Sequence, residues 1–131
     1  MTTPAEIIKS HAVVRLDREA SVHHSGHQNV HARRYLLPRR SGAAVEVMII
    51  VKGNLQLWCE ALPLDRLKGA SLGGTPRPGS ETYATTNAKR NMLYGRHAAL
   101  KTMDRLHRGD AWHFTPKTVG DLNAILDALA A

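Results

Sequence analysis

The sequence is poor in cysteine and in long apolar runs. Its 131 residues include one cysteine, Cys59, so neither an internal disulfide nor a zinc site built from several thiolates can form. We interpret Cys59 as a small buried apolar residue in a reducing compartment. No apolar run approaches the length of a membrane span, and the N-terminal residues lack the charged-then-apolar order of a signal peptide. These absences predict a cytoplasmic protein that has no membrane partner.

Aromatic residues are also few. Two Trp, three Tyr and one Phe leave a core made mainly of aliphatic side chains. Hydrophobic residues make up 43% of the chain, which fits a single compact domain over residues 1–131 with a flexible loop at about 69–86. That loop is rich in Gly and Pro but lacks the Gly-Lys-Ser/Thr ending of a phosphate-binding loop. The sequence also lacks a recognisable catalytic constellation, so enzymatic activity is not expected.

Acidic residues are outnumbered. The chain has 18 Lys and Arg against 11 Asp and Glu, a net charge of +7 with neutral histidine. A basic chain of this size directs attention to polyanions as partners. The position of the charges is more informative than their sum, because many small basic proteins bind no nucleic acid.

The stretch around which the fold is organised is 45–61. A run rich in β-branched residues is followed by Gly53-Asn54 and then by an alternating run, which predicts a β-hairpin with a two-residue turn. In that register Ile50 pairs with Leu57, and Ile49 pairs with Trp58 on the opposite face. The face of Ile49 and Trp58 is too apolar for free exposure. A helix of the same chain, a homodimer contact or a ligand is expected to cover it.

Patterns on either side complete an α+β class. We expect an antiparallel three- to four-stranded meander in the N-terminal half, packed by C-terminal helices. The predicted elements before the hairpin are a helix capped by Thr3 over 3–9, a strand over 12–16, a strand over 29–37 and a turn at 38–42. Those after it are a helical turn over 63–68, helices over 87–94 and 96–108, a strand over 110–114 and a last helix capped by Thr118.

Histidines concentrate in residues 21–31. On a helix, His23, His27 and His31 would share one face, a spacing that suits a metal ion. Ser25-Gly26 interrupts such a helix, and no nearby carboxylate or Cys completes a ligand set. The alternatives are a loop whose imidazoles lie near a phosphate or a solvated loop without a role. We therefore predict no metal site and no cofactor.

Two basic segments contain no acid. Four Arg and no acidic residue lie between Glu19 and Glu46, and four basic residues and no acidic residue lie between Thr82 and Met103. On the predicted 96–108 helix, His97, Lys101, Arg105 and Arg108 form a basic ridge opposite an apolar face. Guanidinium and ammonium groups in such segments suit phosphate oxygens, although an ordinary solvated face has the same composition. The residues expected to contact nucleic acid are Arg33, Arg39, Arg40, Arg77, Lys89, Arg90, Arg96, Lys101, Arg105 and Arg108.

The first functional expectation is therefore a nucleic-acid-binding module, with duplex DNA as the favoured partner and Asn87 or Asn91 as base readers. The second is a small metal-independent nuclease or toxin that uses a histidine with a nearby cation, such as His31 with Arg33 or His97 with Arg96. The third is a dimeric accessory or structural protein whose charge serves only solubility. No known family is suggested by these patterns.

Overall fold

The computed structural model describes residues 3–27, 31–90 and 92–131 and has an α+β fold. Its main sheet is fully antiparallel, with the strand order β1-β2-β3-β4-β8-β5. The strands are β1 (Ser21–Val22), β2 (Ala32–Leu37), β3 (Val45–Ile50), β4 (Gln56–Glu60), β5 (Thr75–Arg77) and β8 (Ala111–Phe114). The predicted N-terminal antiparallel meander is confirmed, and the two later strands widen it.

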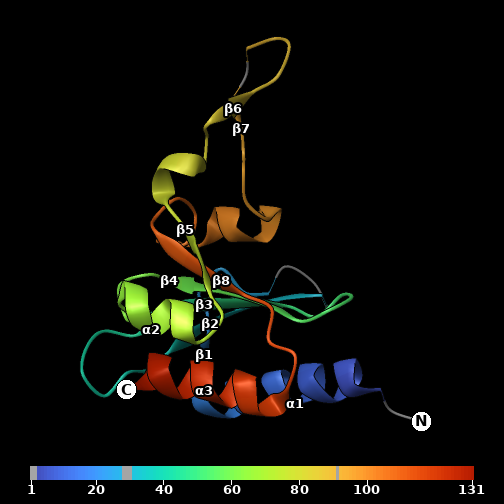
Figure 1. Cartoon of the computed structure of the whole chain (residues 1–131). Coiled ribbons are helices and arrows are strands. Elements are labelled where there is room, and N and C mark those ends of the chain that lie inside the picture. Colours follow the sequence, from blue (N-terminus) through green and yellow to red (C-terminus); the bar gives the residue numbers. More distant parts are fainter. Residues whose placement is uncertain (1–2, 28–30, 91) are drawn as a thin grey trace.

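The sheet is covered on both faces (Figure 1). Helices α1 (Pro4–Glu19) and α3 (Val119–Ala130) pack on one face over a cluster that includes Ile49, Leu57 and Phe114. The other face carries an irregular layer, residues 94–108, whose only helical piece is the 3₁₀ helix η2 (Ala98–Thr102). This layer buries Met48, Ile50 and Trp58 together with its own apolar side chains. No helix in the described part of the chain is long and apolar enough to cross a membrane.

Helix α1 begins as the sequence predicts but runs much further. Thr3 and Glu6 exchange side-chain to backbone hydrogen bonds in a capping box, and Pro4 follows the cap. The strand predicted over 12–16 is wrong, because these residues continue the helix. Ile8, Ala12 and Leu16 recur every fourth residue and are buried on one side, and this period outweighs the β-branched pair at 13–14.

The β3–β4 hairpin forms, but its predicted register is wrong by one residue. Ile49 pairs with Leu57 and Met48 with Trp58. Gly53 has φ +74°, yet the connection spans residues 51–55 rather than two residues, and Leu55 is buried in the helix-side core. The shift exchanges the faces, as a one-residue slip must. Ile49 and Trp58 therefore lie on opposite faces, and each is covered by its own chain.

The helices predicted over 87–94 and 96–108 are wrong. Residues 85–93 form a hairpin of strands β6 (Thr85–Thr86) and β7 (Met92–Leu93). Beyond η2 the chain runs through turns, and Leu100, Met103 and Leu106 are buried at intervals of three residues. A helix would use the N–H groups of residues 104–106 internally, whereas here the Glu46 side chain accepts all of them.

The Gly- and Pro-rich stretch 69–86, predicted as a flexible loop, has secondary structure. It contains the end of α2 (Arg66–Ser71), strand β5, the 3₁₀ helix η1 (Gly79–Glu81) and strand β6. Pro76 is tolerated in β5 because β5 is an edge strand. The strand over 110–114 and the last helix are confirmed, with the N–H of Asp121 donating to the Thr118 side chain.

Candidate functional site

A hairpin arm projects from the body of the protein (Figure 1). We define the arm as residues 82–95, of which residue 91 is not described. The N–H of Gly95 donates to the Thr82 carbonyl over 2.7 Å and closes its base, and the β6–β7 pairs Thr85–Leu93 and Thr86–Met92 follow. At the tip the N–H of Arg90 donates to the Asn87 carbonyl over 2.9 Å. The arm therefore carries its tip residues away from the sheet on a two-stranded ribbon.

Four exposed cations lie on the arm or at its base. Lys89 and Arg90 form part of the tip, and Arg90 has φ +62°. Lys101 lies over the Tyr94 ring at 5.2 Å, and Arg108 lies over the Tyr83 ring at 5.9 Å. None of these cations forms an ion pair with a carboxylate among the described residues. Their positive charge is therefore available to an external anion.

The base of the arm is an aromatic cluster. Tyr94 stacks on His107 with ring centroids 5.6 Å apart, and Tyr83 lies 5.6 Å from Tyr94. The Tyr94 hydroxyl donates to the His107 carbonyl over 2.8 Å. Burial raises the pKa of Tyr94 to about 12 although Arg96 opposes the shift, so the phenol stays neutral. This cluster fixes the arm to the irregular layer. It was not predicted from the sequence, because residues 87–94 and 96–108 were expected to form helices.

Three of the predicted nucleic-acid contacts on this side are already engaged within the protein. Arg77 lies over the Trp58 ring at 4.9 Å and within 3.5 Å of Glu81. Arg96 is buried and donates to the carbonyls of Leu106 and Arg77 over 3.1 and 2.8 Å. Arg105 pairs with the Glu60 carboxylate at 2.6 Å. These side chains hold the irregular layer on the sheet, because Arg96 and Arg105 belong to that layer and bind Arg77 of β5 and Glu60 of β4.

The remaining three residues lie on the helix side of the sheet. Arg33 donates to the Tyr35 hydroxyl and pairs with Asp17 of α1 at 3.2 Å. Arg39 donates to the Leu129 carbonyl near the end of α3, and the Arg40 backbone is bonded to α3 as well. The ten predicted contacts therefore do not form one surface, because the β-sheet separates Arg33, Arg39 and Arg40 from the arm.

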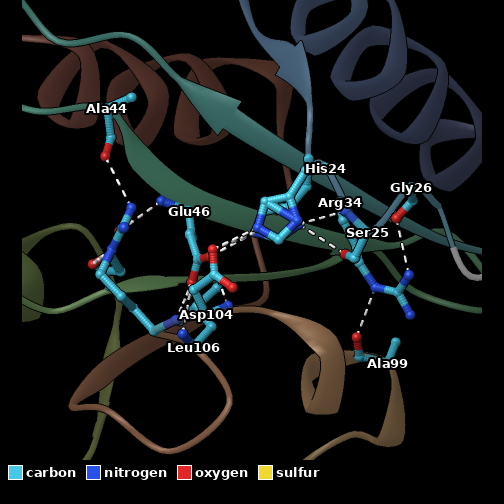
Figure 2. Close-up of polar contacts among 12 residues, drawn as sticks. His24, Ser25, Gly26, Arg34, Ala44, Glu46, Ala99, Asp104 and Leu106 are labelled. Carbon is cyan, nitrogen blue, oxygen red and sulfur yellow. Dashed lines mark hydrogen bonds and ion pairs between the residues drawn. The ribbon is translucent and has the colours of Figure 1, made fainter.

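A buried carboxylate organises the irregular layer (Figure 2). The Glu46 side chain is fully buried, and it accepts the N–H groups of Asp104, Arg105 and Leu106 over 2.7–2.9 Å. Its other neighbour is His23 Nε2 at 2.6 Å. Burial alone would raise the pKa of Glu46, but these hydrogen bonds outweigh it and lower the pKa, so the group is ionised at neutral pH. Neither this role nor that of His23 has a local sequence signal, because residues 104–106 lie 58–60 residues and His23 lies 23 residues from Glu46 along the chain.

The histidines are divided among different environments. His23 and His24 approach Asp104, with 2.6 Å between His24 Nε2 and the carboxylate (Figure 2). His27 Nδ1 accepts the backbone N–H of Arg34, and His97 Nδ1 accepts that of Ala99. The helical face proposed for His23, His27 and His31 does not exist, because a turn follows β1. The structure describes His31 but not residues 28–30 or Asn91, so the proposed reading of a base by Asn91 lies outside the described residues.

Comparison with known proteins gives no functional lead, because no family model, curated protein or solved structure matches this chain.

Proposed function

We propose that the protein binds nucleic acid through the hairpin arm, with duplex DNA as its partner. The observation that carries the proposal is the set of four exposed cations, Lys89, Arg90, Lys101 and Arg108, which have no carboxylate partner among the described residues. Unpaired cations at the tip and at the base of one projecting element suit the regular phosphate spacing of a nucleic acid.

The shape of the arm favours a duplex over a single strand. A two-stranded β-ribbon fits the major groove of B-DNA, where the tip meets base edges and the base meets the phosphates. Single-strand binding needs aromatic faces that are free to stack on bases. Here Tyr94 and His107 already stack on each other at an interplanar angle of 12°. In this complex the cations of the tip would contribute affinity, and Asn87 would meet the groove.

The composition of the arm supports a second candidate function. Met92 is 66% exposed and Leu93 is 42% exposed. In the DNA complex such side chains would contact thymine methyl groups or sugars. In the alternative, they would pack on a protein partner, including a second copy of this chain. Sedimentation separates the two, because Met92→Ser/Leu93→Ser dissociates an oligomer only if the arm holds it together.

The test is fluorescence anisotropy with labelled duplex DNA, duplex RNA and single-stranded DNA across a salt series. The double variant Lys89→Ala/Arg90→Ala should weaken duplex binding and reduce the slope of log affinity against log salt by about 2, roughly one per lost phosphate contact. The matched control is Arg40→Ala/Lys117→Ala. It removes the same charge from two exposed residues on the helix side.

The control variant distinguishes DNA binding at the arm from general electrostatic attraction of DNA to the whole protein. We expect the DNA affinity and the salt slope of the control variant to stay close to those of the unmodified protein. Equal weakening by the two double variants would mean that the net charge of +7 attracts DNA without using the arm. Absence of binding at low salt would refute nucleic-acid binding altogether.

A further inference from the structure

Two histidines and an aspartate meet at one point of the surface. His23 and His24 follow β1, and Asp104 comes from the irregular layer 80 residues after His24. One nitrogen of each ring and one oxygen of Asp104 all lie within 4.8 Å of one another. Consecutive side chains in a strand point to opposite faces. The turn after β1 instead brings the His23 and His24 rings together, with centroids 4.2 Å apart. The fold thus assembles a donor set that is dispersed in the sequence.

We propose that His23, His24 and Asp104 bind a divalent transition-metal ion such as Zn²⁺. Imidazole nitrogens and a carboxylate oxygen are the ligands that such ions favour. Two carboxylates supply the negative charge that balances the ion. One is the ligand Asp104, and the other is Glu46, which lies 2.6 Å from His23. Three protein ligands leave a coordination position open for water or a substrate.

The distances fit an ion after small movements. Two atoms bound to one tetrahedral zinc ion at about 2.1 Å lie about 3.4 Å apart. His23 Nε2 and Asp104 Oδ2 are 4.0 Å apart, and His24 Nε2 and Asp104 Oδ2 are 2.6 Å apart. These pairs need changes of about 0.6 and 0.8 Å, and the two ring nitrogens lie within 4.8 Å of each other. The side chains of His24 and Asp104 are 62% and 55% exposed, so they are free to move, whereas His23 is fixed by burial.

Metal binding also requires a proton to move on His23. In the metal-free protein the Ser25 N–H donates to Nδ1 over 3.1 Å, so Nε2 carries the ring proton and donates it to Glu46. When Nε2 binds a metal, the ion takes the place of the proton between Nε2 and Glu46 Oε2, so that oxygen moves away from the ring or joins the ligands. The proton moves to Nδ1, where the Ser25 hydroxyl at 2.7 Å accepts it in place of the donated Ser25 N–H. Glu46 keeps the N–H groups of Arg105 and Leu106 on its other oxygen. The surroundings of His23 therefore accept either ring tautomer.

The test is calorimetric titration of the chelator-treated protein with Zn²⁺, followed by the visible spectrum with Co²⁺. The site should take up one equivalent of Zn²⁺, and Co²⁺ should give the strong absorption of a four- or five-coordinate ion. His24→Ala and Asp104→Asn should each weaken Zn²⁺ binding at least ~10-fold. Both positions are exposed, and Asp104→Asn keeps the backbone N–H that Glu46 accepts, so the variants should fold.

His31→Ala is the matched control, since it removes an exposed histidine outside the cluster. Its Zn²⁺ affinity should equal that of the unmodified protein. Substoichiometric uptake would overturn the site. So would equal weakening by His31→Ala, or Zn²⁺ affinity that survives both His24→Ala and Asp104→Asn. In those cases Zn²⁺ would be binding to scattered surface histidines.

Discussion

Replacing Glu46 should detach the irregular layer from the sheet. The carboxylate accepts three backbone N–H groups and faces His23, and all of these bonds are 2.6–2.9 Å long. In Glu46→Ala the N–H of Leu106 and the His23 ring stay buried without that acceptor. Removing one partner of a buried, charged hydrogen-bond network costs about 3–5 kcal/mol. A domain of this size has about 5–15 kcal/mol of stability in total, so the variant should be close to unfolding.

Glu46→Gln provides the quantitative measurement. The amide keeps one acceptor oxygen for the N–H groups of Arg105 and Leu106, but it presents an NH₂ group toward the N–H of Asp104. We expect a loss of about 2–3 kcal/mol, between the unmodified protein and Glu46→Ala. Urea unfolding followed by circular dichroism measures it, and the fluorescence of Trp58, which the irregular layer covers, reports that layer.

The control for the Glu46 variants is Glu81→Gln, which removes an exposed carboxylate 3.5 Å from Arg77. Its cost should be below about 1 kcal/mol, since exposed ion pairs contribute little. A Glu46→Gln variant as stable as Glu81→Gln would refute the conclusion that the carboxylate holds residues 104–106.

Two further predictions concern packing and pH. A Cβ at Gly69 would lie 2.3 Å from the Trp112 ring, so Gly69→Ala should lower the free energy of urea unfolding by about 1–3 kcal/mol. The control is Gly120→Ala, whose Cβ would meet no atom closer than 3.7 Å, and it should be neutral or slightly stabilising. Burial, helped by the charge of Arg77, lowers the pKa of His113, so the unfolded chain binds this proton first as the pH falls. The contribution of His113 to stability should be complete above about pH 6.5 and should decline below that pH. Urea midpoints measured from about pH 7.5 to pH 5 should therefore fall less steeply in His113→Gln than in the unmodified protein. An unchanged decline would exclude His113 as its source.

Local sequence patterns predict the candidate sites only in part. The acid-free stretch 82–103 was recognised from composition, and it does contain Lys89, Arg90 and Lys101 of the arm and its base. Their arrangement was predicted incorrectly, since Lys89 and Arg90 were expected on a helix over 87–94 and Lys101 on the basic ridge of a helix over 96–108, where the chain forms a ribbon and turns. No role was predicted for Asp104. Its proximity to His24 depends on two segments meeting across 80 residues, which no local period reveals.

Features with local causes follow from the sequence alone. Thr3 and Thr118 cap their helices through bonds to residues three positions later, and the alternation at 111–114 directs Trp112 and Phe114 to one face. The hairpin register and the path of residues 96–108 depend instead on contacts between distant parts of the chain. Leu55 shifts the register by entering the core, and Glu46 takes the N–H groups that a helix would have used internally. Both outcomes depend on a long-range competition for burial and hydrogen bonds, which outweighs local propensity.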